Sequence, residues 1–320
     1  MSQRLKWLLK IALSGLILWL VATRIDWPEL WGVLRAVRYP VLGLSFLALF
    51  VQQFLMVVTW RLVIRQMSGE VSLGAVLYSH LVGNFYGTLL PSTLGIDVIR
   101  ALSLQKFGAR VADAAATLVT TRAIGFSALF FLAGWAYFFP ASREMALRFA
   151  PALLLSFGVF LCCLAAVAWP HFLSPVEAAF RKLEAERLAR IVADVRRAFS
   201  LSFRSGEGIA LVFALSVVYQ FLGVFVAYLL GVSVGASATI DAFLFVVPAV
   251  TILTAIPISV AGLGVREGSF VVLLGQVGVP AESALSISLL FFLQALFLAF
   301  LGGAVHWAVS LGRTKPAVPQ

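Results

Sequence analysis

The sequence predicts an all-α membrane protein, a polytopic bundle of helices. Hydrophobic residues make up 62% of the 320 residues, charged residues make up 12%, and the mean hydropathy is +1.02. Soluble proteins use apolar residues for about half of the chain and charged residues for about a quarter, so a water-soluble fold is excluded. The apolar residues form blocks of roughly 17 to 25 residues, the length that a helix needs to cross the hydrocarbon core. The sequence shows no sustained alternation of the kind that barrel strands require.

The basic residues lie beside the hydrophobic blocks. A formal net charge of +10 would suggest a nucleic-acid partner in a soluble domain. Next to apolar segments, however, Lys and Arg set the topology and contact anionic headgroups, so we expect no nucleic-acid partner. The two cysteines, Cys162 and Cys163, are adjacent within one apolar run. They cannot join distant segments and are interpreted as packing residues.

Six segments are long and apolar enough to be spanning helices. These are residues 7–23, 41–60, 114–138, 150–169, 209–230 and 284–310. The first begins among basic residues as a signal peptide would, but Lys10 interrupts its apolar run and no clear cleavage site follows. We expect it to be retained as a helix. Two further apolar stretches, about 72–100 and 241–281, are interrupted by Pro and Gly.

Charge asymmetry indicates how the two interrupted stretches lie. If both are re-entrant hairpins, 17 of the 24 Lys and Arg face the cytoplasm, five face outward and two lie at membrane depth. If both cross fully, the segment 170–208, with seven Lys and Arg, faces outward, against the positive-inside rule. We therefore predict six spans and two re-entrant hairpins, with both termini in the cytoplasm.

This arrangement contains an internal symmetry. Each half of the chain reads helix, helix, interrupted hairpin, helix, and the two halves have opposite orientations. The halves are residues 7–138 and 150–310. Pro91 to Arg100 and Pro257 to Arg266 have the same nine-residue spacing. Inverted repeats with paired interrupted segments are typical of transporters whose site lies at the repeat interface near the midplane.

The segment 170–208 is the only sizeable polar region. Ser174, Pro175 and Glu177 form a capping-box start with Pro at the first helical position, followed by a loose apolar stripe. We predict a cytoplasmic interfacial helix. A role as a plain connector between the halves stays open beside a regulatory or lipid-contacting role. Residues 313–320 are predicted to be a disordered tail.

Charged side chains within the apolar stretches need a physical reason, because ionisable groups in hydrocarbon are costly unless they are paired or hydrated. We expect a polar cavity where breaks at Pro91 and Pro257 free backbone groups and present helix N-termini. Arginines there suit an anionic headgroup, above all phosphate, which Arg binds bidentately. The charged residues are Asp97, Arg100, Arg122, Arg266 and Glu267.

Structural roles for these residues stand beside substrate contact. Asp97 and Glu267 can neutralise neighbouring arginines and hold the hairpins in place, and Arg100 can anchor its hairpin at the headgroups. Polar and glycine candidates also fit helix packing, where small residues allow close approach. The full set of candidate substrate-contacting residues is Asn84, Pro91, Ser92, Asp97, Arg100, Arg122, Pro257, Ser259, Gly262, Gly264, Arg266 and Glu267.

Signals of catalysis are weak. The three histidines, His80, His171 and His306, have no metal-ligand spacing. The sequence contains no phosphate-binding loop and no Cys/His nucleophile pattern. We expect no cofactor, no metal and no enzymatic activity. Without an ATP-binding domain, transport would be passive, ion-coupled or powered by a partner.

The interrupted stretches carry two motifs. The first is Gly83, Asn84, Leu90, Pro91, Ser92, Gly95, Asp97 and Arg100. The second is Pro257, Ile258, Ser259, Gly262, Leu263, Gly264, Val265, Arg266, Glu267 and Gly268. With these motifs nearly the whole chain resembles the flippase-like membrane domain of bacterial lysylphosphatidylglycerol synthases, which also occurs as a stand-alone protein. One departure is Ile96, where the family often has a second Gly.

The resemblance implies movement of a lipid between the leaflets of the bacterial cytoplasmic (inner) membrane. The soluble aminoacyl-transfer domain of the synthases has no counterpart in these 320 residues, so lysine transfer is not implied. Stand-alone members are associated with hopanoids, glycolipids and polyprenyl-linked sugars. The resemblance therefore leaves the lipid open.

We expect a lipid flippase or transporter in which an anionic or polar headgroup enters the cavity while the acyl chains stay in the bilayer. In this hypothesis Arg100, Arg122 and Arg266 contact the headgroup, and Asp97 and Glu267 position them. One alternative is a non-transporting accessory subunit of a membrane complex for lipid, hopanoid or glycan biosynthesis. Another is an intramembrane lipid-modifying enzyme.

Overall fold

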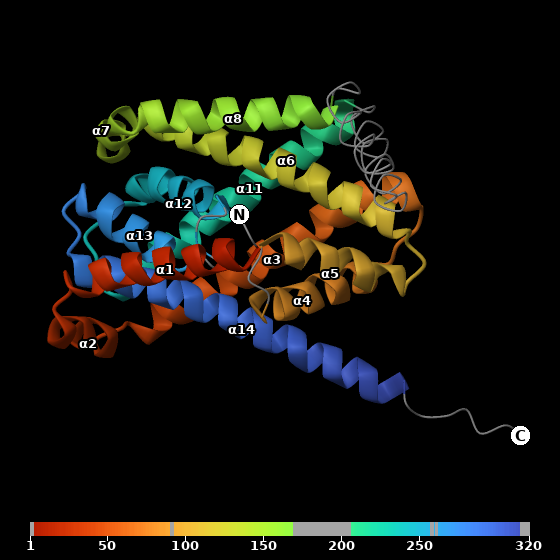
Figure 1. Ribbon diagram of the computed structural model, residues 1–320, viewed down its shortest axis with the longest axis horizontal. Coiled ribbons are helices and arrows are strands. Elements are labelled where there is room, and N and C mark those ends of the chain that lie inside the picture. The colour runs from red at the N-terminus through yellow and green to blue at the C-terminus, as the bar shows by residue number, and fades with distance from the viewer. Residues whose placement is uncertain (1–2, 90–92, 169–205, 257–258, 260–261, 314–320) are drawn as a thin grey trace, which may run out of the picture.

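The computed structural model describes residues 3–89, 93–168, 206–256, 259 and 262–313, and every element within them is helical (Figure 1). The helices are α1 (Gln3–Ala22), α2 (Trp27–Arg35), α3 (Tyr39–Ser68), α4 (Leu73–Leu89), α5 (Thr93–Gln105), α6 (Val111–Trp135), η1 (Ala136–Phe138), α7 (Pro140–Arg148), α8 (Ala150–Ala168), α11 (Gly206–Ser233), α12 (Ile240–Ala255), α13 (Val265–Gly275) and α14 (Ala281–Arg313). Several predictions fall outside the described residues: those for 170–205 and 314–320, and those for Pro91, Ser92 and Pro257.

The described helices form a multi-pass membrane bundle. Four of them, α3, α6 (continued by η1), α11 and α14, are long and apolar enough to cross a membrane, and each corresponds to one predicted span. A fifth span results if α7 and α8, which meet at a bend of 70°, count as one. The predicted first span overlaps α1, whose described apolar part is Ala12–Ala22. The all-helical membrane fold is thus confirmed, with four or five spans among the described residues where the sequence predicted six.

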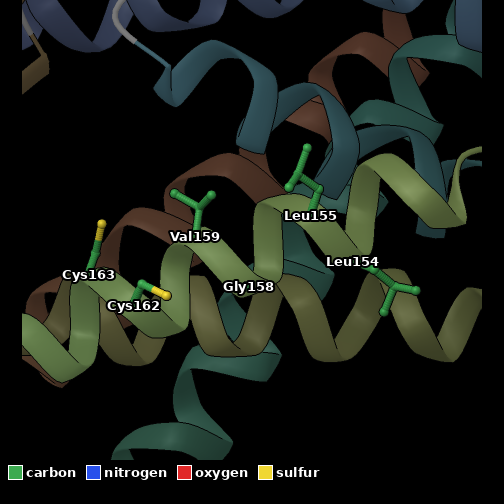
Figure 2. Close-up of a pocket in the computed structure, with 6 residues that line it drawn as sticks. All are labelled: Leu154, Leu155, Gly158, Val159, Cys162 and Cys163. Atoms are coloured by element: carbon green, nitrogen blue, oxygen red, sulfur yellow. The ribbon is translucent and has the colours of Figure 1, made fainter.

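The outer face of α8 is apolar and exposed. Figure 2 shows this face, with Leu154, Leu155 and Val159 projecting from the helix and the two cysteines further along it. Cys162 and Cys163 are free and exposed, so their interpretation as packing residues is wrong. The physical reason is that α8 lies at the edge of the bundle, where exposed apolar side chains suit lipid.

The first interrupted stretch folds back on itself as a helical hairpin. Gly83 on α4 lies against the side chain of Arg100 on α5, and Gly87 lies against Ile96. Gly87 lies four residues after Gly83 on α4, whereas its partner Ile96 lies four residues before Arg100 on α5. The two helices are therefore antiparallel. Gly87 also makes room for Ile96, the residue that departs from the family pattern. Whether the hairpin is re-entrant stays a prediction.

The second interrupted stretch joins α12 to α13 through two glycines in the left-handed region. Gly262 has φ +79° and Gly264 has φ +82°, conformations that side chains other than Gly rarely adopt. Gly262 lies against Thr254 of α12, whereas Gly264 and Gly268 lie against Ile17 of α1. Gly264 and Gly268 therefore allow the close approach of α1 rather than of α12.

The long helix α14 connects the regions of the two interrupted stretches, packing against α13 near its start and against α4 further along (Figure 1). Its Gly302 lies so close to α4 that a Cβ there would collide with the carbonyl oxygen of Leu81, and Gly303 lies against the ring of Phe85. A backbone atom cannot rotate away as a side chain can. The position of the α4–α5 hairpin thus depends on the absence of a side chain at Gly302.

We predict that Gly302→Ala lowers the melting temperature of the detergent-solubilised protein, because the added methyl group forces α14 away from α4. Overpacking of this kind costs about 1–3 kcal/mol. The matched control is Gly134→Ala on α6, where a Cβ meets nothing within 4 Å. Equal melting temperatures for the two variants would contradict the close approach of α14 and α4.

Candidate functional site

Asp97 is the carboxylate shared by two arginines in the first half of the chain. Asp97 and Arg100 lie one turn apart on α5, with Arg100 Nη1 3.4 Å from Asp97 Oδ1. Arg122 on α6 donates its Nε–H to the other oxygen of Asp97. Each carboxylate oxygen therefore faces a different arginine. Asp97 therefore links the hairpin to α6 and brings the guanidinium groups of Arg100 and Arg122 close together.

Arg100 reaches across α4 to a neutral partner. Its Nη2 donates to Asn84 Oδ1 over 2.8 Å. Gly83 makes this path possible, because a Cβ there would collide with Cγ of Arg100. The Gly83–Asn84 pair of the first motif thus has a physical meaning: the glycine lets the arginine pass, and the asparagine binds it.

The hydrogen-bonded contacts continue beyond Asn84 into two more helices. His80, one turn before Asn84 on α4, has Nε2 2.9 Å from Gln53 Oε1 on α3 and 3.4 Å from Asn84 Nδ2. Tyr219 on α11 is hydrogen-bonded to the side chain of Gln53. Five helices thus contribute to one polar network. We call it the Arg100 network: Gln53, His80, Asn84, Asp97, Arg100, Arg122 and Tyr219.

Burial within the Arg100 network is uneven. Arg100 is 9% exposed, and within the described part of the chain its Nε is buried without a hydrogen-bond partner. The side chain of Asp97 is 15% exposed and that of Arg122 is 35% exposed. The network is therefore open at Arg122 and closed at Arg100. The Nε–H of Arg100 is thus a covered donor that the described residues leave without an acceptor.

The charged pair of the second half has a tighter and more complete set of contacts. Glu267 is buried, accepts from the Gly264 N–H over 2.7 Å and pairs with Arg266. The guanidinium of Arg266 also donates to Ser288 over 3.2 Å and lies 4.8 Å from the ring centre of Phe292. Glu267 thus caps α13 and neutralises Arg266. These contacts favour the structural role that the sequence left open for this carboxylate.

The arginines predicted to meet one headgroup lie in two groups. Arg266 contacts α14 at Ser288, whereas the first hairpin meets α14 at Gly302. Because an α-helix rises about 1.5 Å per residue, these two points are about 20 Å apart along α14. Arg100 and Arg122 are brought together, and Arg266 belongs to a different group of contacts. Ser259 is buried, and its hydroxyl has no partner among the described residues.

Sequence reasoning missed three members of the Arg100 network: Gln53, His80 and Tyr219. The sequence presents His80 only as a possible metal ligand, and the described residues contain no group of three or more His, Cys, Asp and Glu that could hold a metal. A signal did exist in the first motif. His80 and Asn84 are four residues apart and therefore share a helix face. The contacts to α3 and α11 depend on long-range packing that no local pattern shows.

We predict that Glu267→Gln lowers the melting temperature strongly, because it leaves Arg266 without its acid. Removing one partner of a buried ion pair costs about 3–5 kcal/mol. Glu70→Gln is the matched control, since Glu70 pairs with Arg65 with its side chain 86% exposed, and such pairs contribute little. A melting temperature for Glu267→Gln as high as that of the control would refute a structural role for Glu267.

Comparison with known proteins places the chain in a family. The family model described as lysylphosphatidylglycerol synthase TM region matches residues 7–303. No curated protein and no solved structure matched the chain. The family is membrane-associated and lipid-related, and the resemblance seen in the two interrupted segments is confirmed. With nearly the whole chain matched, including both motifs, the protein belongs to the lysylphosphatidylglycerol synthase TM region family.

Proposed function

We propose that this protein moves a lipid with an anionic or polar headgroup between the leaflets of the bacterial cytoplasmic membrane, and that the Arg100 network receives the headgroup. The observation that carries the proposal is the state of Arg100. It is buried in an apolar bundle, its acid lies 3.4 Å away, and its Nε–H has no partner among the described residues. A buried guanidinium with an incomplete set of partners can bind another anion.

A phosphate group is an anion that suits Arg100. Arginine presents parallel N–H groups that match two phosphate oxygens, and Arg100 already has one of its Nη groups fixed by Asn84. The neutral amide positions the guanidinium without neutralising it. Arg122, on the more exposed side, would meet the headgroup first. The acyl chains would stay along the apolar outer faces of the bundle.

The proposal includes the topology predicted from charge asymmetry: two inverted repeats with one re-entrant hairpin each and both termini in the cytoplasm. The antiparallel packing of α4 and α5 supports the first hairpin. In this arrangement the first hairpin carries the headgroup site. The second hairpin, with Glu267 capping α13, supplies a rigid counterpart.

The test is transbilayer movement of fluorescent phosphatidylglycerol in vesicles that contain the pure protein. Arg100→Gln is expected to slow this movement about tenfold, the size expected when a charge-assisted hydrogen bond is lost. Arg65→Gln is the matched control, because Arg65 forms an exposed ion pair away from the network. Both variants are first checked for folding by size-exclusion chromatography. The recovered lipid should be chemically unchanged.

Three outcomes would count against the proposal. Equal rates for Arg100→Gln and the control would remove Arg100 from the path. No movement of any lipid tested would favour an accessory subunit of a biosynthetic complex. Conversion of the lipid into a new chemical species would indicate an intramembrane enzyme.

A further inference from the structure

His80 is a buried histidine with one unused ring nitrogen. It is 1% exposed, and within the described part of the chain its Nδ1 is buried without a hydrogen-bond partner. Its Nε2 lies 2.9 Å from Gln53 Oε1. An amide oxygen can only accept, so in this shorter contact Nε2 donates and holds the single proton of the neutral ring. Asn84 Nδ2, itself a donor, lies beside Nε2 at 3.4 Å without accepting from it. Nδ1 is then a free acceptor in the interior of the bundle.

His80 is linked to the headgroup site through a single residue. Asn84 accepts from Arg100 Nη2 through Oδ1 over 2.8 Å, and its Nδ2 lies 3.4 Å from His80 Nε2 as a close contact. Burial itself disfavours a positive charge on His80. In a low-dielectric interior the charge on Arg100 opposes a second positive charge on His80. An anion bound at Arg100 would offset the part of this opposition that comes from Arg100.

Other ionisable groups of the described helices lie around the network. From α5, Asp97 lies beyond Arg100, and Arg122 of α6 lies beyond Asp97. From α11, Tyr219 contacts Gln53, and α3 presents the neutral Gln53 itself. From α14, His306 contacts Tyr78 and Tyr86 rather than His80. Arg100 is therefore the charged group joined to His80 by way of Asn84.

We propose that His80 Nδ1 is a proton-binding site and that one proton moves with each anionic headgroup. This inference rests on the proposed function and adds its energy source. Because the anion favours the proton, the proton favours the anion by the same factor. The proton comes from the solution on the side where the headgroup binds, forms the Nδ1–H bond, and leaves to the solution on the other side with the headgroup.

This coupling determines which gradient drives the lipid. A proton and a singly charged phosphate headgroup together carry no net charge. A pH gradient therefore moves phosphatidylglycerol toward the leaflet that faces the more basic solution, whereas a membrane potential alone leaves it in place. An anion that moved without a proton would follow the membrane potential and would not respond to the pH gradient.

The experiment uses vesicles of phosphatidylcholine and phosphatidylglycerol that contain the full chain and a trace of fluorescent phosphatidylglycerol. Dithionite quenching reports the lipid in the outer leaflet after a pH gradient, or a potassium diffusion potential at equal pH, is imposed. Protein-free vesicles give the background. One proton per lipid predicts a leaflet ratio approaching about tenfold per pH unit, the factor that corresponds to one bound proton, and no response to the potential.

Two variants test the assignment to His80. His80→Gln has no nitrogen that takes up a proton, so its leaflet distribution under a pH gradient should be even, whatever its absolute rate. His306→Gln is the matched control and should keep the wild-type response. The comparison of gradient with potential in the wild-type protein decides whether a proton moves with the lipid even if His80→Gln fails to fold.

The outcomes separate this inference from the proposed function. Movement that follows the potential and ignores the pH gradient overturns the proton site and leaves lipid transport standing. A pH response that persists in folded His80→Gln overturns the assignment to His80. Absence of any movement under either gradient refutes the proposed function and this inference together.

Discussion

The structure is organised around one guanidinium group that cannot give up its charge. Arginine stays protonated in proteins, so Arg100, once buried among apolar helices, requires fixed partners. Asp97 supplies a carboxylate from the same helix, Asn84 supplies an amide oxygen from the facing helix, and Gly83 leaves the space through which the side chain passes. The antiparallel packing of α4 and α5 is therefore also the means by which Arg100 is held, and the close approach of α14 at Gly302 keeps that hairpin in position.

The two interrupted stretches use the same residue types for different purposes. In the first, one acid is divided between two arginines, and the Nε–H of Arg100 has no partner among the described residues. In the second, one acid serves one arginine, and a hydroxyl and an aromatic ring complete its surroundings. A symmetric sequence pattern thus gives an asymmetric distribution of charge. This difference is why we propose the headgroup site at the first hairpin alone.

Much of the fold followed from the sequence because hydropathy and helix length are local properties. Four predicted spans lie in α3, α6, α11 and α14, and the pairing of Asp97 with Arg100 is visible in their spacing. The contacts of Gln53, His80 and Tyr219 depend on three helices meeting, so no spacing along the chain reveals them. The same limit applies to Arg266, whose separation from Arg100 depends on where each hairpin meets α14. The exposure of Cys162 and Cys163 depends on the position of α8 at the edge of the bundle.

The central claim is that Arg100 has an N–H group reserved for a lipid phosphate. The most direct measurement is an electron cryo-microscopy structure of the protein in nanodiscs that contain phosphatidylglycerol. The account predicts density for a phosphate group about 2.7–3.2 Å from Arg100 Nε, with Arg122 on the side from which the headgroup enters. A structure in which a protein group occupies Arg100 Nε, with lipid bound only to the outer faces of the helices, would contradict it.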